Sequence, residues 1–207
     1  MIDLYTWGTP NGRKVSIMLE AIQAPYRVHS VNILEDEQFS EHFTQLSPNG
    51  KIPAILDSEG PDGKPYSLFE SGAILIYLAE KSGQFLATDS AQKMQTLQWL
   101  MWQMGGFGPF LGQAHHFNHF LKEDVPYAKA RYLKEAQRLW GVLDTQLSER
   151  QFVCDEMSIA DFAIYPWSRR HAWQNVDTAN FPNVARWMAD MDSYDFVRRG
   201  MAVPDER

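Results

Sequence analysis

The chain has 207 residues, of which 44% are hydrophobic and 22% charged, a composition typical of a folded globular protein with a substantial core. Its formal net charge of −7 argues against binding to nucleic acids or to anionic membranes. A single cysteine, Cys154, excludes an intramolecular disulfide framework. There is no signal-peptide pattern and no apolar run of about 18 residues. We therefore expect a cytoplasmic protein without nucleic-acid or membrane partners.

The first part of the chain alternates strands with helices. An apolar strand over residues 2–7 precedes a helix over 14–23, whose apolar residues follow the one-sided helical spacing. The other elements expected here are a strand over 26–31, a short helix over 39–46, a hairpin of strands 54–56 and 66–69, and a helix over 73–81 that ends at Gly83. This order is that of a thioredoxin-like α/β unit.

After about residue 88 the pattern becomes helical throughout. Four helices are expected, over residues 91–104, 128–147, 158–173 and 182–191. Ser158 and Asp161 have the spacing of a capping box, and the glycines and proline of segment 105–109 predict a kink or break. The predicted architecture is therefore an α/β domain over residues 1–84, a linker over 85–88 and an all-α domain over 89–207.

The turn between the first strand and the first helix reads Thr9-Pro10-Asn11-Gly12, where a thioredoxin-like protein can carry a Cys-x-x-Cys motif. Thr9 and Gly12 occupy the two cysteine positions, so thiol chemistry would need a thiol brought by a bound cofactor. In one interpretation Thr9 and Pro10 simply begin the helix. In the other, the helix N-terminus and the Thr9 and Asn11 donors stabilise a thiolate and lower its pKa.

Two further segments suggest recognition of a peptide-like ligand. Pro53 favours an extended Ile52, and a cis bond between them would offer the Ile52 backbone to an extended ligand, whereas a trans bond would indicate an ordinary loop. Ser71 at a helix start suits a carboxylate and Glu70 an ammonium, which together match an amino-acid head group. Helix capping alone also explains both residues.

These segments resemble a known family. Ile52-Pro53 and Glu70-Ser71, followed by a helical domain, resemble the cytosolic glutathione transferases. A more specific resemblance is to their nu class, the bacterial disulfide-bond reductase group that is similar to the yeast nitrogen-regulation prion protein. It depends on the motif at 9–12, on segments 47–55 and 68–75, and on the stretch from Leu97-Gln98-Trp99 through His115-His116-Phe117-Asn118-His119. It covers most of the chain and weakens after about residue 175.

The resemblance implies glutathione as the cofactor, one or two molecules per site, no metal, and reduction of small disulfides by the bound thiolate. It assigns Thr9 and Asn11 to the glutathione sulfur. The other implied glutathione-binding residues are Gln38, Lys51, Ile52, Glu70, Ser71 and Arg131. Arg131 would reach a glycyl carboxylate or a second glutathione, although an ion pair with Glu135 also explains it. The family implies a homodimer, with helix 97–110 as the contact.

Two other classes of function stay open at this point. The chain could be an enzyme that conjugates glutathione to electrophiles or reduces organic hydroperoxides. It could instead be a non-catalytic regulatory protein that binds glutathione. The competing site residues are few. Tyr5 matches the tyrosine of other transferase classes, but its place within a strand favours packing. His115 and His119 have a metal-binding spacing without an evident third ligand, which favours a structural role, and Cys154 is expected to be structural. The predicted pocket residues are Trp7, Phe110 and Trp167.

Overall fold

The computed structural model describes residues 1–204, which form two compact units. Unit 1 contains residues 1–86 together with the described residues from 194 onward, and unit 2 contains residues 87–193. Each unit is built around its own core.

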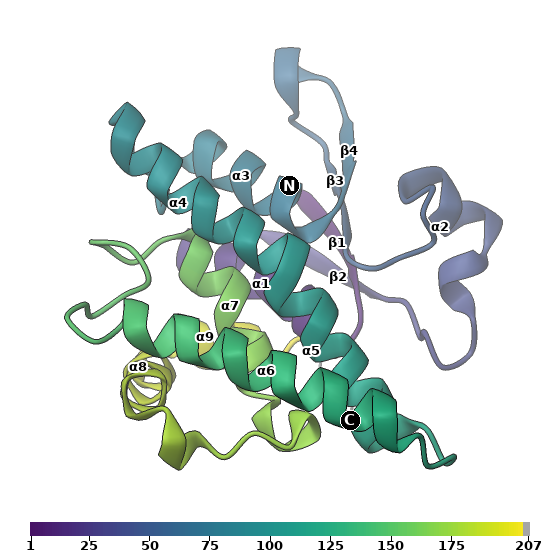
Figure 1. Ribbon diagram of the computed structural model, residues 1–207. Helices are drawn as coiled ribbons and strands as arrows, with labels where there is room; N and C mark the ends of the chain where they lie inside the picture. The colour runs from purple at the N-terminus through teal and green to yellow at the C-terminus, as the bar shows by residue number, and fades with distance from the viewer. Residues whose placement is uncertain (205–207) are drawn as a thin grey trace. The chain divides into compact units, whose positions relative to one another are not determined.

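Unit 1 is built on a four-stranded mixed sheet (Figure 1). The strands β1 (Ile2–Thr6), β2 (Tyr26–Ser30), β3 (Ala54–Asp57) and β4 (Tyr66–Phe69) lie in the order β2-β1-β3-β4. β1 is parallel to β2 and antiparallel to β3, and β3 is antiparallel to β4. Leu4, at the centre of the sheet, is opposite Val28 on one side and Ile55 on the other. The predicted thioredoxin-like arrangement is confirmed.

Three helices of unit 1 follow the predicted order. α1 (Pro10–Ala21) and α3 (Ser71–Ser82) pack against each other, while α2 (Glu41–Leu46), which follows a 3-10 turn over Glu37–Phe39, contacts β3 and β4 (Figure 1). α1 begins at Pro10, earlier than the predicted residue 14, because Thr9 already caps it. α3 ends as expected at Gly83, whose φ of 67° suits glycine.

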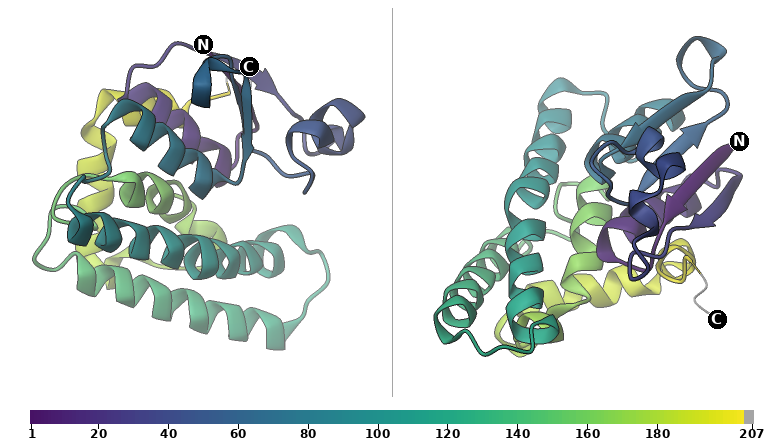
Figure 2. Two further views of the ribbon diagram at one scale, coloured as in Figure 1. Left: turned by 90° about the horizontal axis from the view of Figure 1, so that it is seen from above. Right: turned by 90° about the vertical axis from the view of Figure 1, so that its right-hand side faces the viewer.

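The last helix is α9 (Asp195–Met201). The predicted all-α domain over residues 89–207 includes it, but in the structure α9 packs on α1 and belongs to unit 1 (Figure 2). Its Gly200 makes this possible: a Cβ there would lie 2.5 Å from the Ile17 Cα, so only glycine lets the two backbones approach so closely. Ser16 Oγ donates a hydrogen bond to the Gly200 carbonyl (2.6 Å), and Arg199 pairs with Glu20 (2.6 Å). The C-terminal residues therefore complete the first unit.

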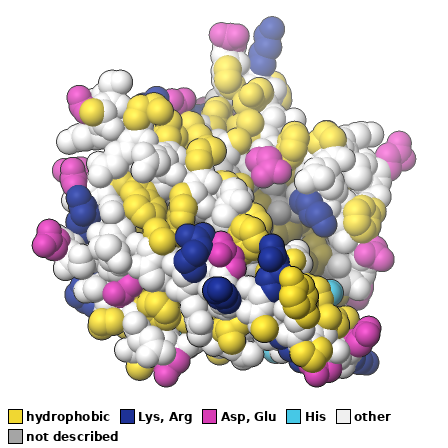
Figure 3. All heavy atoms as spheres, viewed as in Figure 1, with side chains coloured by type: hydrophobic (Ala, Val, Ile, Leu, Met, Phe, Trp, Pro, Cys, Tyr) yellow, Lys and Arg dark blue, Asp and Glu magenta, His cyan; other side chains and the backbone are white. Residues whose placement is uncertain are grey.

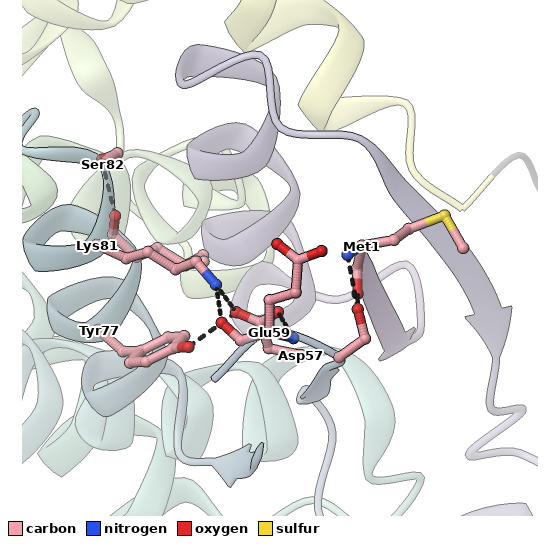
Figure 4. A network of polar contacts seen from close by, with 8 residues as sticks. Met1, Asp57, Glu59, Tyr77, Lys81 and Ser82 are labelled. Carbon is pink, nitrogen blue, oxygen red and sulfur yellow. Dashed lines mark hydrogen bonds and ion pairs between the residues drawn. The ribbon is translucent and has the colours of Figure 1, made fainter. Parts of the chain in front are cut away.

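A polar network ties the end of β3 to α3 (Figure 4). The buried Asp57 carboxylate accepts hydrogen bonds from Tyr77 Oη (2.8 Å), from the Glu59 N–H (2.9 Å) and from Lys81 Nζ. Burial acts to raise the pKa of Asp57, but these hydrogen bonds outweigh it and hold the pKa below its usual range. The ionised carboxylate thus links the strand and the helix.

All the regular elements of unit 2, over residues 87–193, are helices. Its α-helices are α4 (Ser90–Trp102), α5 (Gly108–His115), α6 (Pro126–Gln146), α7 (Ile159–Ser168) and α8 (Pro182–Ser193). The sequence predicts a kink or break at the glycine-rich segment; the helix does not break there, and a π-helical turn over Gln103–Phe107 carries α4 directly into α5. A helix predicted over 158–173 ends at Ser168 and is followed by a 3-10 turn over His171–Gln174.

The core of unit 2 surrounds α7. The predicted capping box is present: Ser158 caps the helix, and the Asp161 carboxylate accepts the Ser158 N–H (2.9 Å). Asp161 also accepts hydrogen bonds from the Val153 N–H (2.9 Å) and the Trp187 indole N–H (3.0 Å), so the same carboxylate joins α7 to a loop and to α8. Across residues 1–204, no helix is both long enough and apolar enough to cross a membrane.

Candidate functional site

The N-terminus of α1 has the geometry predicted for a helix entry with a polar lining. Thr9 is extended (φ −106°, ψ 161°), and its Oγ1 accepts the Gly12 N–H at 3.3 Å, with Pro10 at the first helical position. Within residues 1–204, no group accepts the proton of the Thr9 hydroxyl. The cap and the donor function are therefore compatible, since the oxygen accepts one bond from the helix while its proton can be donated to a ligand. Asn11 is half-buried in the first turn.

Gly12 explains why this turn cannot carry the second cysteine of a Cys-x-x-Cys motif. A Cβ at this position would lie 2.3 Å from Thr6 Oγ1 and 2.5 Å from the Trp7 carbonyl oxygen. Real Cβ atoms do not approach other atoms so closely. The first turn of α1 thus rests directly against the end of β1, and there is no space for a thiol side chain.

A second part of the site forms where two loops meet. Gly50 has a φ of 59°, and a Cβ there would lie 3.0 Å from the Phe39 ring and 3.4 Å from the Gln38 carbonyl oxygen. This close approach brings Gln38 beside the segment that leads to Lys51. Gln38 is 8% exposed, and its buried Oε1 has no hydrogen-bond partner within residues 1–204. Such an orphaned acceptor is costly unless a ligand supplies a donor.

The Lys51–Ile52 segment continues directly into the sheet. The Ile52–Pro53 peptide bond is cis, the alternative that the sequence left open. β3 begins at Ala54, so the Ile52 N–H and C=O lie outside its pairing with β1 and β4. Lys51 is exposed and Ile52 is half-buried. The segment therefore presents the Ile52 backbone, which lies outside the sheet pairing, next to the exposed Lys51 side chain.

A third part is the N-terminus of α3. Glu70 holds the N-cap position with φ 70° and ψ 111°, a conformation that is rare outside glycine, and its side chain does not cap the helix. Helix capping therefore does not account for the Glu70 side chain. Strained residues of this kind cluster at ligand sites, where the surrounding structure maintains them. Ser71, the first residue of α3, is 3% exposed.

The residue that joins the first and third parts is one that sequence reasoning does not single out. Lys14 is 1% exposed, and its Nζ donates a hydrogen bond to Ser71 Oγ at 3.3 Å. Burial lowers the pKa of Lys14 to about 7, and the nearby Glu70 carboxylate partly opposes this shift. A signal is present in the sequence, since Lys14 precedes the apolar Ile17 and Met18 by three and four residues on one helix face.

Unit 1 thus gathers all but one of the predicted site residues: the α1 and α3 N-termini meet through the Lys14–Ser71 bond, and Gln38 lies beside the Gly50–Lys51 turn. The exception is Arg131, which lies in unit 2 and is exposed on α6. It lines a cavity of about 680 Å³ together with Phe110, Tyr127, Ala130, Tyr132, Lys134, Glu135 and Arg138.

Basic side chains gather around an acidic one on the face of α6 (Figure 3). Glu135 pairs with Arg138, through bonds of 2.8 and 2.7 Å from its Nε and Nη2 atoms. The alternative in which Glu135 pairs with Arg131 is therefore not what the structure shows. Within residues 1–204 Arg131 forms no ion pair, and its side chain lines the cavity.

The remaining candidates pack into the interior. Tyr5 is 9% exposed, belongs to a core cluster and stacks on the His29 ring at 4.5 Å, as its position in a strand predicts. His115 is buried against Trp167, with ring centroids 5.3 Å apart, and burial lowers its pKa to about 4, so it is neutral. Cys154 is buried, and burial raises the pKa of its thiol. Among residues 1–204 no group of three or more His, Cys, Asp or Glu side chains is arranged to hold a metal ion.

Comparison with known proteins agrees with this geometry. Residues 1–80 match the N-terminal domain of glutathione S-transferase, and residues 107–193 match its C-terminal domain. Disulfide-bond oxidoreductase YfcG of Escherichia coli is 49% identical over 189 residues, which cover 90% of this chain and 88% of that protein. The chain belongs to the glutathione transferase family. The resemblance seen in the sequence is confirmed.

Solved glutathione transferases share the fold closely. One from Pseudomonas putida, with one glutathione disulfide bound per subunit, superposes with a TM-score of 0.94 at 48% identity, covering 98% of this chain and 91% of that one. Another family member, from Pseudomonas fluorescens and with two glutathiones bound, has a TM-score of 0.95 at 48% identity, covering 98% and 93%. The transferase fold predicted from the sequence, thioredoxin-like followed by helical, is therefore confirmed.

Proposed function

We propose that this glutathione transferase reduces small disulfides with glutathione, whose thiolate is stabilised by Thr9 and Asn11 at the N-terminus of α1. The observation that carries the proposal is the Thr9 hydroxyl: its oxygen already accepts the Gly12 N–H, so its proton is directed away from the helix. The helix N-terminus adds favourable partial charge for an anion. The name of YfcG, a disulfide-bond oxidoreductase, supports the same reaction class.

Each part of the site has a group that suits a part of glutathione. The orphaned acceptor Gln38 Oε1 fits a peptide N–H, and the exposed Lys51 fits the glycyl carboxylate. The Ile52 backbone can pair with the extended cysteinyl residue. Glu70 and Ser71 match the ammonium and carboxylate of the γ-glutamyl end. The residues present therefore fit the tripeptide along its whole length.

Bound glutathione would supply the thiolate, which would attack one sulfur of the substrate disulfide and release the other half as a thiol. A second glutathione would then attack the glutathione sulfur of the mixed disulfide and release the other half of the substrate. Two glutathiones thus become glutathione disulfide, and the substrate becomes two thiols. The chain supplies no sulfur, since Cys154 is buried. Its contribution is to lower the pKa of the bound thiol from near 9 toward neutral, which raises the thiolate fraction by roughly 10- to 100-fold. Arg131, in the cavity on α6, is proposed to take the carboxylate of a glutathione.

The test is a disulfide-exchange assay with glutathione and 2-hydroxyethyl disulfide. Thr9→Ala and Asn11→Ala are each expected to lower kcat/KM by roughly 10- to 100-fold, as expected for a lost hydrogen bond to a charged group. Thr9→Ser retains both the cap and the hydroxyl and should stay within about threefold of the wild type. Asn180→Ala, at an exposed position in unit 2, is the matched control. Unchanged turnover in both test variants would remove their assigned roles.

The same assay separates the alternative functions. Rates on an aryl halide and on an organic hydroperoxide test conjugation and peroxidase activity, which use the same thiolate. Glutathione binding without turnover of any of the three substrates would instead favour a regulatory protein. We propose disulfide reduction as the principal activity because YfcG, which is 49% identical to this chain, is named a disulfide-bond oxidoreductase.

A homodimer is part of the proposal. The exposed apolar residues Met94 and Met101 lie on α4, where hydrophobic side chains are visible at the surface, and they line a shallow hollow with other residues of that helix (Figure 3). Such a patch favours a protein contact. Met94→Lys combined with Met101→Lys should convert the species seen by light scattering to a monomer; a wild type that is already monomeric would contradict the proposal.

A further inference from the structure

A fully buried serine, Ser47, begins the loop that leads from α2 to β3 (Figure 1). It directly follows α2, where its N–H donates to the Phe43 carbonyl at 2.8 Å. Its own carbonyl accepts the Gly50 N–H at 2.8 Å, so residues 47–50 form a turn. Pro48 at the second position and Gly50 at the fourth, with a φ of 59°, suit such a turn. The backbone of Ser47 is therefore fully bonded without its side chain.

The Ser47 hydroxyl holds the backbone of a different residue, Lys51. Its Oγ donates a hydrogen bond to the Lys51 carbonyl oxygen at 2.8 Å and accepts the Lys51 N–H at 3.4 Å. A carbonyl oxygen can only accept, so the direction of the serine proton is fixed. The hydroxyl is buried and uses its single proton within the chain, so it does not itself donate to a ligand.

Peptide geometry extends this constraint to Ile52. The Lys51 carbonyl and the Ile52 N–H belong to one planar, trans peptide unit, so the two groups point in opposite directions. Because the carbonyl is directed at the buried Ser47, the Ile52 N–H is directed away from it. Within residues 1–204 this N–H has no hydrogen-bond partner, although Ile52 is half-buried. Since such donors are normally paired, it suits an acceptor on a ligand.

We propose that Ser47 is a positioning residue for glutathione: by holding the Lys51 carbonyl, it directs the Ile52 N–H toward the cysteinyl carbonyl of the tripeptide. The inference rests on the proposed function in that the site binds glutathione beside the Ile52 backbone. Without the hydroxyl, the peptide unit between Lys51 and Ile52 is free to rotate about its flanking bonds. The effect concerns affinity for the backbone of the ligand and leaves the thiolate to Thr9 and Asn11.

The test compares two ligands by calorimetry on the wild type and on Ser47→Ala. One ligand is S-methylglutathione, which cannot form a thiolate. In the other, a trans alkene replaces the cysteinyl–glycine peptide bond of S-methylglutathione, so the ligand keeps its extended shape but lacks the carbonyl. The wild type should bind this analogue about two- to tenfold more weakly, the range for one neutral hydrogen bond. Ser47→Ala should bind S-methylglutathione with a similar loss and distinguish the two ligands by less than about twofold.

The chain offers a matched control in Thr44→Ala. Thr44 Oγ1 also bonds to backbone carbonyls, those of Ser40 (3.0 Å) and Glu41 (3.1 Å), but at the start of α2 and not in the loop. This variant should bind both ligands as the wild type does.

Amide hydrogen exchange gives a second measurement, which needs no variant. In the wild type, bound S-methylglutathione should slow the exchange of the Ile52 N–H by about tenfold or more, because the N–H then has an acceptor. The alkene analogue, which offers no carbonyl, should slow it much less.

The outcomes separate this inference from the proposed function. If the wild type binds neither ligand, the proposed function fails. If it binds S-methylglutathione, but Ser47→Ala distinguishes the two ligands as strongly as the wild type does, Ser47 acts only on the loop structure and the inference is overturned. Unchanged exchange of the Ile52 N–H in the bound wild type overturns it as well, and this result can be obtained even if Ser47→Ala does not fold.

Discussion

The substitution Gly12→Ala tests whether the close contact between α1 and β1 is as tight as the structure indicates. In an ordinary helix interior, alanine is more favourable than glycine by about 1 kcal/mol. At Gly12, however, the new Cβ would lie 2.3 Å from Thr6 Oγ1 and 2.5 Å from the Trp7 carbonyl oxygen. The threonine side chain is fully buried, and the carbonyl belongs to the backbone, so neither atom can yield easily. Overpacking of this kind costs about 1–3 kcal/mol.

The expected net effect of Gly12→Ala is therefore a loss of stability of about 1–2 kcal/mol, despite the better helix propensity. The chain offers a matched control in Gly141→Ala on α6, where a Cβ would have no atom within 4 Å. That variant should gain about 0.5–1 kcal/mol. Urea unfolding followed by circular dichroism and tryptophan fluorescence gives both values.

Midpoints that shift upward in both glycine variants would refute the reasoning, because the contact at Gly12 would then be relieved without cost. A downward shift of the unfolding midpoint for Gly12→Ala alone would also explain why this turn carries no cysteine at position 12. If even a methyl group is not tolerated at position 12, a cysteine is not tolerated either. Packing then closes the second position of a Cys-x-x-Cys motif to a thiol.

Three further predictions concern stability. Asp57→Asn should lower the free energy of unfolding by about 1–3 kcal/mol at pH 7, because it removes the charge that Lys81 and Tyr77 contact. Since the pKa of Asp57 is lowered in the folded state, the difference in stability from the wild type should shrink as the pH falls below about 4. A difference that stays constant with pH would contradict this. Burial raises the pKa of Asp161 to about 6, so the stabilisation linked to its protonated form is fully present below about pH 4 and is lost as the pH rises through 6. Asp161→Asn should abolish this pH dependence of the free energy of unfolding, measured by chemical denaturation at a series of pH values. Gly200→Ala should cost about 1–3 kcal/mol and speed hydrogen exchange in α9, whereas unchanged protection there would show that the helix does not depend on the close approach.

Much of the fold follows from local physical chemistry that is visible in the sequence. Thr9 and Pro10 begin α1, and Ser158 with Asp161 begins α7, because a helix start needs partners for its free N–H groups and these residues provide them in place. The strand pattern and the hairpin are equally local. The family, too, is evident from short motifs, since glutathione recognition uses a few fixed residue types at helix and strand ends.

The tertiary structure decided what depends on contacts between distant segments. Lys14 shares a helix face with the apolar Ile17 and Met18 in the sequence, but only the packing of α3 against α1 makes it a buried partner of Ser71. Gly200 looks like an ordinary helix-end glycine until the backbone of α1 lies against it. In both cases the deciding quantity is the space left by a segment more than 50 residues away, because local propensity determines how a segment folds, while long-range packing determines what it touches.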